Sequence, residues 1–401
     1  MAANQESCFR QKKGVYMPEK RKKSNTGGSI RKRKNGLWEA QYIAGRKEDG
    51  RPIRRSLYAS SKQEVREKLW EVLRQLARDE YIEPSRITTG EWLDYWFAFY
   101  CIPLKRASTC TGYEDELNLH IKPYVGKILL QELKPHDVQS AINALVGQKR
   151  APSTIRKAHA ILHSALKQAV VNQLLFHNPS DHTILPKMEQ KDIRFFSLPE
   201  QKAFIAALPP GTAGRALYFI LGTGLRVEEL AGLRWSDIHG TYFSIAQTIR
   251  RNRNFAEDAE TRTFLESATP KTKAGRRNIP LTPKMQELLM AQRAEQMITR
   301  IAAGEKWCSN DLVFSTDLGT PYEGRNLNRV LHRTLEEAGL QSMGVHSLRH
   351  TFATRAMEAG MDVRTLSEIL GHAKVSLTLQ LYAHSSMETK QKELEKMDVF
   401  L

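Results

Sequence analysis

Two segments in the second half of the 401-residue chain place arginine and histidine where they could hold an anion. In LGTGLRVEELAGLRWSDI (221–238), Arg226 follows two glycines and precedes apolar residues at helical spacing. Its guanidinium is therefore expected at the positive end of a helix dipole. In GVHSLRHTFATRAMEAG, the i, i+3, i+4 spacing places His346, Arg349 and His350 on one helical face. An arginine and histidines without a metal suit the non-bridging oxygens of a phosphate.

A third segment offers a lysine. TPKTKAGRRNIPLTP (269–283) predicts a β-hairpin with Ala274-Gly275 at its turn and a short apolar returning strand. Lys271 or Lys273 would project from this loop and could reach into a site, and the residues leave both lysines open. A solvated turn is the alternative interpretation of the same segment.

A fourth group combines a helix end with a tyrosine. Gly371 is typical of a helix C-terminus, His372 follows it directly, and Tyr382 lies ten residues further on. Taken one at a time, these groups have ordinary explanations, such as an ion pair between Arg226 and Glu229 or a tyrosine in a helical core. HSLRH lacks the adjacent glutamate of HExxH, and no third ligand follows at a usual distance, so we predict no metal site.

Charge indicates the kind of partner. The chain has 61 Lys and Arg against 44 Asp and Glu, a net charge of +17. Residues 1–58 hold 16 of the basic and 5 of the acidic residues, a net charge of +11. Such a basic end favours nucleic acid through electrostatic steering and counterion release. For residues 1–27, a solvated basic tail is the alternative.

Composition excludes several other classes. No run approaches the roughly 18 apolar residues of a membrane span, and the N-terminus lacks the apolar stretch of a secretory signal. The four cysteines fit neither a CxxC metal spacing nor a disulfide scaffold. A P-loop and a carboxylate cluster are also missing from the sequence. We therefore expect a cytoplasmic protein that has no membrane contact and needs no cofactor.

Five segments are expected along the chain, and the predicted fold class is multidomain and mainly α. Residues 1–28 form a basic N-terminus, 29–81 three short antiparallel strands and a helix, and 88–180 a helical bundle. Residues 192–386 form a mixed α/β domain with a small antiparallel sheet, and 387–401 a C-terminal helix. KNG and GRKEDGR mark the turns between the three strands. The aromatic run EWLDYWFAFY is more typical of a bundle core than of a base-stacking platform.

Further basic residues are candidates for contact with nucleic acid. They lie on the predicted N-terminal sheet, along one side of the bundle and beside the predicted hairpin: Arg31, Lys32, Arg33, Lys34, Arg46, Lys47, Arg54, Arg55, Lys149, Arg150, Arg156, Lys273 and Arg276. The charged stretch 250–268 is interpreted as an insertion. It is either a second hairpin that contacts DNA or a partner subunit, or a solvated loop.

The order and spacing of the four groups resemble the signature of the tyrosine recombinase/integrase family. That signature is an arginine in GLRxEEL, a lysine in a hairpin ending in IPL, HxLRHTFAT, LGH, and then a tyrosine followed by AH. The basic N-terminal sheet and helical middle resemble the integrases of conjugative transposons and lambda-type phages. The resemblance covers most of the chain, and its C-terminal motifs are highly specific.

The resemblance implies a bacterial site-specific recombinase that integrates and excises a mobile element. Tyr382 would attack a DNA phosphodiester and form a 3′-phosphotyrosyl bond, while two arginines clamp the non-bridging oxygens and two histidines hydrogen-bond the same phosphate. Lys271, which matches the family string better than Lys273, would protonate the leaving 5′ oxygen. The catalytic residues so implied are Arg226, Lys271, His346, Arg349, His372 and Tyr382.

The resemblance also implies partners. It predicts double-stranded DNA at core and arm sites, a tetramer on DNA in which residues 387–401 dock onto a neighbouring subunit, and an excision factor. Neither ATP nor a metal is expected, because the phosphotyrosine keeps the energy of the broken bond. Two alternatives stay open: a DNA-binding regulator of the same fold that does not cleave, and an enzyme like the type IB topoisomerases.

Overall fold

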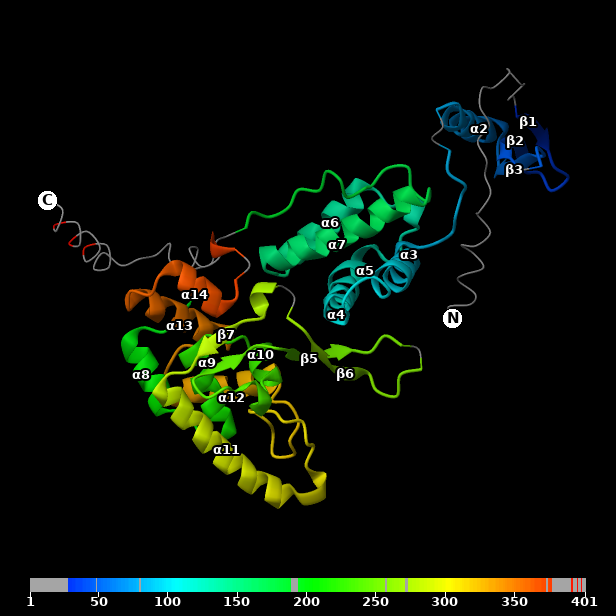
Figure 1. Ribbon diagram of the computed structural model, residues 1–401. Coiled ribbons are helices and arrows are strands. Elements are labelled where there is room, and N and C mark those ends of the chain that lie inside the picture. The colour runs from blue at the N-terminus through cyan, green and yellow to red at the C-terminus, as the bar shows by residue number, and fades with distance from the viewer. Residues whose placement is uncertain are drawn as a thin grey trace. The chain divides into compact units, whose positions relative to one another are not determined.

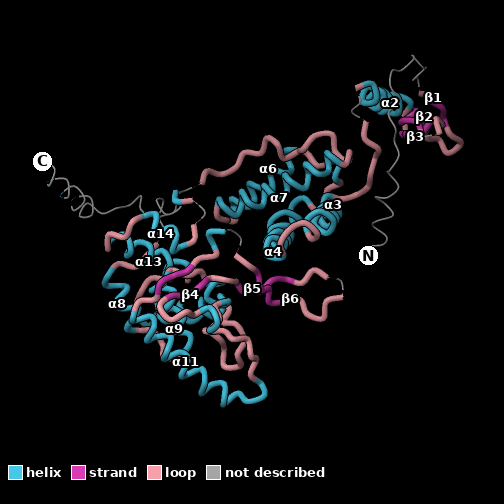
Figure 2. Tube along the Cα trace, in the orientation of Figure 1, coloured by secondary structure: helices cyan, strands magenta, loops and turns pink. Residues whose placement is uncertain are grey.

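The computed structural model of the protein describes residues 28–47, 49–78, 81–188, 194–256, 258–270, 273–372 and 374–376, with the single positions 391, 395 and 398. The chain divides into two compact units, Met1–Glu189 and Gln190–Leu401, drawn in Figures 1 and 2. The predicted mainly helical, multidomain fold with small antiparallel sheets is confirmed. Within the described ranges, no helix is long and apolar enough to cross a membrane. The basic N-terminus and the C-terminal helix predicted over 387–401 lie almost entirely outside the described residues.

A three-stranded antiparallel sheet and one helix come first in the described chain, as the sequence predicts. The strands β1 (Ser29–Lys32), β2 (Trp38–Arg46) and β3 (Pro52–Ala59) lie in the order β1-β2-β3. Helix α2 (Lys62–Ala77) begins after Ser61, whose side chain accepts a hydrogen bond from the Glu64 N–H. Apolar side chains of α2 cover alternate residues of β2, which include the buried Tyr42. The opposite face, which carries Ile43 and Arg54, is open among the described residues.

The helical bundle follows in the same unit. Its helices are α3 (Thr89–Trp96), α4 (Ala107–Glu116), α5 (Lys122–Val125), α6 (Pro135–Gly147) and α7 (Pro152–Val171). Helices α6 and α7 begin with proline, which suits the first helical position because its missing N–H would have no partner there. Trp92 is fully buried, and its indole N–H donates to the Ala165 carbonyl at 3.0 Å. The prediction that the aromatic run forms core is confirmed for Trp92, Trp96 and Phe97.

The second unit is built around α9. Its helices are α8 (Leu198–Ala206), α9 (Thr212–Thr223), α10 (Val227–Gly232), α11 (Pro283–Ala303), α12 (Gly324–Glu337), α13 (His346–Glu358) and α14 (Val363–Leu370). Leu217, Phe219 and Ile220 of α9 expose no surface, and α11, α12 and α13 pack around them (Figure 1). Ser197 and Glu200 form a capping box at the start of α8.

The strands of this unit pair differently from the prediction. Its described strands are β4 (Tyr242–Ser244), β5 (Thr248–Arg253), β6 (Thr263–Ala268) and β7 (Asn278–Pro280), and β7 pairs with β4 instead of forming a hairpin within 269–283. The predicted hairpin is therefore wrong. Pro270 cannot donate to a ladder, residues 273–275 form a 3-10 turn, and Ile279 instead lies opposite Phe243 in the buried core. Strands β5 and β6 do form a hairpin over the insertion, although its contact with DNA stays a prediction.

Candidate active site

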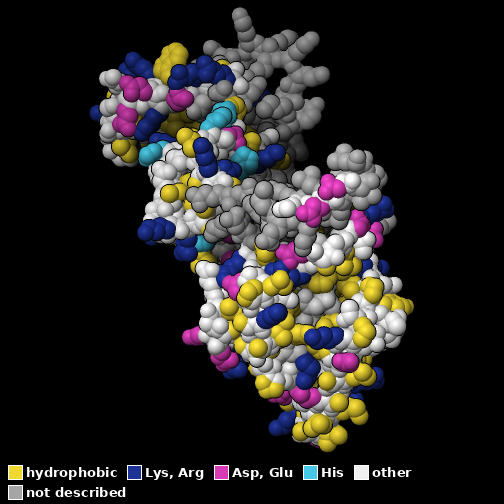
Figure 3. All heavy atoms as spheres, turned by 90° about the vertical axis from the view of Figure 1, so that its left-hand side faces the viewer, with side chains coloured by type: hydrophobic (Ala, Val, Ile, Leu, Met, Phe, Trp, Pro, Cys, Tyr) yellow, Lys and Arg dark blue, Asp and Glu magenta, His cyan; other side chains and the backbone are white. Residues whose placement is uncertain are grey.

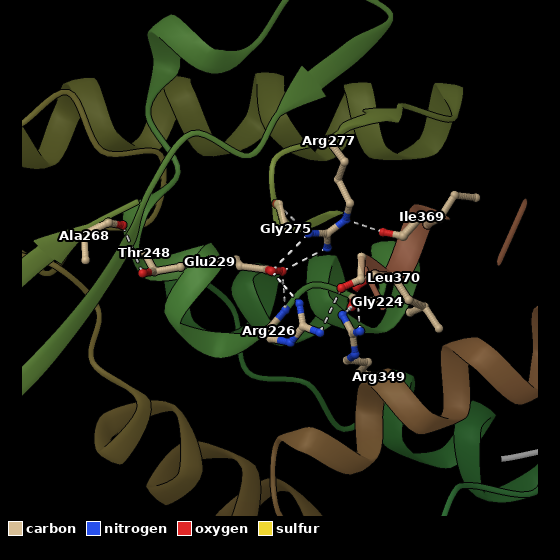
Figure 4. A network of polar contacts seen from close by, with 11 residues as sticks. Gly224, Arg226, Glu229, Thr248, Ala268, Gly275, Arg277, Arg349, Ile369 and Leu370 are labelled. Carbon is tan, nitrogen blue, oxygen red and sulfur yellow. Dashed lines mark hydrogen bonds and ion pairs between the residues drawn. The ribbon is translucent and has the colours of Figure 1, made fainter. Parts of the chain in front are cut away.

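The C-terminal end of α14 collects three arginines from separate parts of the second unit (Figure 4). The carbonyls of three successive residues each accept a hydrogen bond from a different guanidinium. Arg277 donates to Ile369, Arg349 to Leu370 and Arg226 to Gly371. The last carbonyls of a helix have no partner within the helix and carry its partial negative charge. The helix end therefore holds the cationic side chains together.

Arg226 lies at the N-cap of α10 and is held by a buried carboxylate. Its guanidinium donates to Glu229 Oε1 at 2.8 Å and its backbone N–H donates to Oε2 at 3.0 Å. The Arg226 side chain is 34% exposed, whereas that of Glu229 is 2% exposed. The pair is therefore not an ordinary surface ion pair. Glu229 fixes Arg226 from the protein side and leaves part of the guanidinium available to a ligand.

Sequence reasoning missed Arg277 as a member of this site. Its two terminal nitrogens donate to the two Glu229 oxygens, both at 3.0 Å, and one of them also reaches the Gly275 carbonyl at 3.1 Å. Burial tends to raise the Glu229 pKa, but the hydrogen bonds and charge of Arg277 and the charge of Arg226 hold it below its ordinary value. A strand alternation counted back from Ile279 would have placed Arg277 on the buried face and Arg276 outside.

Arg349 is the most buried of the predicted phosphate ligands. It lies on the second turn of α13 and is 2% exposed. Its terminal nitrogens donate to the Gly224 carbonyl at 2.7 Å and the Leu370 carbonyl at 2.6 Å. Burial, followed by the charge of Arg226, lowers the pKa of Arg349 to about 9. The side chain is still a cation at neutral pH, and a phosphate beside it would offset the cost of burying that charge.

The charges of the arginines act on three histidines, His346, His350 and His372. His346 begins α13, and its ring contacts that of His350 edge to face at 4.7 Å. Burial is the main cause of a lowered pKa at each of them, to about 4 for His350 and for His372. The charges of Arg226 and Arg349 act in the same direction on His346 and His372. The structure thus brings four of the six predicted catalytic residues into one electrostatic environment.

The lowered histidine pKa values predict a loss of stability in mild acid. Between pH 6.5 and about 4 the unfolded chain binds protons at His350 and His372 that the folded chain does not bind. The free energy of unfolding must therefore fall as the pH falls through this window. We expect the second unit to unfold at lower denaturant concentration at pH 5 than at pH 7, measured by chemical denaturation.

A histidine substitution tests the source of that acid sensitivity. His350→Asn should make the pH dependence shallower, because it removes one half-buried imidazole whose buried Nδ1 has no hydrogen-bond partner among the described residues. The control is His136→Asn, at an exposed histidine of α6, and this variant should keep the wild-type slope. Equal slopes for all three proteins would contradict the prediction.

Two predicted catalytic residues, Lys271 and Tyr382, lie outside the described residues. Lys273 begins the short 3-10 turn Lys273–Gly275. The choice between the two lysines is therefore still open. The segment that follows them is anchored through the bond from Arg277 to the Gly275 carbonyl.

Thirteen basic residues are candidates for DNA contact. Twelve of them are exposed, and the side chain of the thirteenth, Lys273, lies outside the described part of the structure. Arg31 and Arg33 bind Glu39, whose pKa is lowered mainly by the hydrogen bond from Arg33. Glu39 is fully buried, so both arginines are tied to the open face of the sheet. Arg55 lies opposite Tyr42 and bonds Glu83, so its strand position faces away from the open face. Two other candidates bond carbonyls, Arg46 that of Gly50 and Arg156 that of Pro186.

Comparison with known proteins identifies the family and the fold. A model described as the phage integrase family matches residues 212–389, and one described as phage integrase, N-terminal SAM-like domain matches residues 88–146. A tyrosine recombinase XerC-like protein of Caldanaerobacter subterraneus subsp. tengcongensis is 28% identical over 387 residues, which cover 92% of this chain and 98% of the relative. The ICEBs1 integrase of Bacillus subtilis is 24% identical over 380 residues, with coverage of 93% and 100%.

Solved structures of similar fold are integrases. The Tn1549 transposon integrase in complex with transposon right end DNA has a TM-score of 0.62 and 19% identity, and covers 78% of this chain and 99% of its own. A lambda integrase tetramer bound to a Holliday junction has a TM-score of 0.57 and 17% identity, with coverage of 91% and 99%. Fold and family matches together define a multidomain protein of the integrase class. The chain belongs to the phage integrase family, that of the tyrosine recombinases.

Proposed function

We propose that this protein is a site-specific DNA recombinase that integrates and excises a mobile element by cutting and rejoining DNA. The observation that carries the proposal is the placement of Arg226 and Arg349 at the end of α14, with His372 directly beyond it. Three arginines against one carboxylate leave a positive charge that a phosphodiester would offset. Relatives named as the transposase of Tn916 and the ICEBs1 integrase support the same interpretation.

The chemistry follows from the side chains in named roles. The Tyr382 hydroxyl attacks phosphorus in line with the 5′ oxygen; a P–O bond to tyrosine forms as the P–O5′ bond breaks. Arg226 and Arg349 stabilise the charge that develops on the non-bridging oxygens. A free tyrosine has a pKa near 10, so its proton needs an acceptor. The lowered pKa of His372 keeps its imidazole neutral and able to accept that proton, while Lys271 or Lys273 protonates the leaving oxygen.

The proposed partners follow from the family and from the charge. The helical bundle and the second unit bind the core DNA site, and the open sheet of residues 29–81 binds an arm site. The lambda integrase relative is a tetramer on a Holliday junction, which supports a tetramer here, with residues 387–401 docking onto a neighbour. An excision factor would set the direction of the reaction.

One experiment tests the proposed function. The protein is incubated with a DNA substrate from candidate element ends that is nicked so that the cleaved strand dissociates, and covalent adducts are separated in SDS gels. We expect an adduct with wild type and none with Tyr382→Phe. A wild-type protein that binds the DNA without forming an adduct would support the non-cleaving regulator. Relaxation of a plasmid without any specific site would favour the topoisomerase-like alternative.

The open sheet face predicts a distinct effect on DNA binding. Replacing Arg31, Lys34, Lys47 and Arg54 by glutamine should weaken binding to arm DNA, and the slope of log affinity against log salt should fall by about 0.9 for each phosphate that the variant no longer neutralises. Adduct formation on core DNA alone should be unchanged. The control replaces four basic residues of α2, on the other side of the sheet: Lys62, Arg66, Lys68 and Arg74. Equal salt slopes for the two quadruple variants would contradict an arm site on the open face.

A further inference from the structure

Arg277 joins three parts of the site without access to the DNA. Its side chain is 7% exposed, and it donates to three acceptors within the protein: the Glu229 carboxylate, the Gly275 carbonyl and the Ile369 carbonyl. These acceptors belong to α10, to the loop that follows the two candidate lysines, and to α14. A planar guanidinium with five donors can serve all three at once, whereas a lysine ammonium cannot match that geometry.

The contacts of Arg277 lead to both phosphate-clamping arginines. Through Glu229 they reach Arg226, since the same carboxylate accepts from both guanidinium groups. Through Ile369 they fix the last turn of α14, whose next carbonyl accepts from Arg349. Resting on the proposed recombinase function, we propose that Arg277 is a positioning residue that sets the spacing of Arg226 and Arg349 for the scissile phosphate.

The test separates positioning of the arginines from positioning of the lysine. Arg277→Met is compared with wild type in single-turnover adduct formation on two DNAs, one with the natural bridging 5′ oxygen and one with sulfur in its place. A thiolate leaves without a proton, so the sulfur substrate bypasses the general acid. We expect Arg277→Met to be about 10²-fold slower on both DNAs, with DNA affinity little changed because Arg277 is buried. Lys271→Ala or Lys273→Ala should be slow on the oxygen substrate alone.

A second variant is needed in case Arg277→Met does not fold. Arg277→Lys keeps the charge. If Arg277 acts through Arg226, the double variant of Arg277→Lys and Arg226→Lys should lose less rate than the product of the two single losses. Wild-type rates in Arg277→Met, rescue of that variant by sulfur, or full additivity in the double variant would each overturn the proposal. A wild-type protein that forms no adduct on either DNA would instead overturn the proposed function.

A different observation concerns α11, which is apolar on two opposite faces. Met285 and Leu289 are buried in the unit's core. The opposite face carries Met290, Met297, Ile298 and Ile301, which are 61% to 80% exposed, with Ala291 and Ala294 exposed between them. Figure 3 shows hydrophobic side chains at the bottom of the molecule, at the height where α11 ends in Figure 1. A contiguous apolar patch of this kind is typical of an interaction site.

The spacing of this face fits a second copy of itself. Residues 291, 294, 298 and 301 alternate by three and four, as in the seam of a coiled coil. Reversing the helix about Gln296 places Ile301 opposite Ala291 and Ile298 opposite Ala294, so that each large side chain meets a small one. A parallel pair would instead put alanine against alanine and isoleucine against isoleucine. We propose that α11 pairs with α11 of a second copy of the chain, antiparallel about a two-fold axis near residue 296.

The size of the contact sets its strength. The exposed stripe is about 18 Å long, and two such stripes bury on the order of 600 Å², less than the roughly 1,200 Å² at the lower limit of stable complexes. The pairing is therefore weak in the free protein, and its population depends on concentration. It would join copies that DNA has already brought close together. This proposal does not depend on the chemistry of the active site.

Oligomeric state and crosslinking test the pairing with the full chain. In sedimentation velocity, wild type should show a concentration-dependent dimer that Ile298→Asp abolishes, while Ile184→Asp, at an exposed apolar residue of the first unit, keeps it. For crosslinking, Cys8 and Cys308 are changed to serine; the other cysteines, Cys101 and Cys110, are buried. Met297→Cys, near the axis, should then form a disulfide dimer and Ile301→Cys should not. A monomer at every concentration, or the reverse crosslinking pattern, would overturn the proposal.

Discussion

Arg349→Lys is expected to lower the rate of DNA cleavage by about 10² to 10³-fold, the range seen when one preorganised charge-stabilising donor is removed. The guanidinium of Arg349 spans two carbonyl acceptors, those of Gly224 at 2.7 Å and Leu370 at 2.6 Å. A single ammonium nitrogen cannot reproduce that fork while also holding a phosphate oxygen. A lysine starts from a pKa near 10.4, below that of arginine, so the same burial and the charge of Arg226 would bring it closer to neutrality. The variant should therefore lose geometry and part of its charge together.

The measurement is single-turnover adduct formation with saturating DNA, which separates cleavage from binding. Arg364→Lys is the matched control, because Arg364 lies on α14 at the end opposite to the site, and its side chain is 84% exposed and pairs with Glu368. Its cleavage rate should equal that of wild type. If Arg349→Lys also cleaves at the wild-type rate, the two carbonyl contacts do not matter for the reaction, and the proposed clamp is wrong.

Local patterns predicted the site residues that depend on helix ends. Gly371 adopts φ 64°, as expected of a helix C-cap, and Arg226 occupies the N-cap of α10. Such positions are decided within one helical turn, so that sequence spacing is sufficient. The N-caps Ser61 and Ser197, at the starts of α2 and α8, are decided locally in the same way.

Local sequence patterns could not predict the pairing of strands that are far apart in the sequence. The partner of β7 is β4, more than thirty residues earlier, and not the residues just before the Ala274-Gly275 turn. A turn motif cannot reveal this, because the buried Phe243 selects the register of Ile279. The register in turn decides that Arg277 faces inward and Arg276 outward. The sequence shows two adjacent arginines, and only the sheet distinguishes a buried positioning residue from an exposed basic one.

Gly371→Ala is the second substitution with a large expected effect. Gly371 links α14 to His372, and its own carbonyl accepts from Arg226. A Cβ at this position would lie 2.7 Å from Arg277 Nη1 and 2.8 Å from the Ala274 carbonyl oxygen. The backbone must shift to relieve these contacts, which moves the carbonyls that hold all three arginines. A displacement of about 1 Å in a reacting geometry can cost about 10²-fold in rate, so we expect adduct formation to fall by at least that factor.

Gly339→Ala separates this effect from backbone strain. Gly339 has φ 66°, almost the same as the 64° of Gly371, but a Cβ there would meet nothing within 4 Å. Both variants bear the cost of an L-residue in the left-handed region, roughly 1–2 kcal/mol, and both should lower the unfolding temperature. Only Gly371→Ala should lose cleavage, because only there does the added methyl group press against Arg277. Equal cleavage by the two variants would mean that the arginines tolerate movement of the α14 end, and the site would then owe its geometry to Glu229 instead.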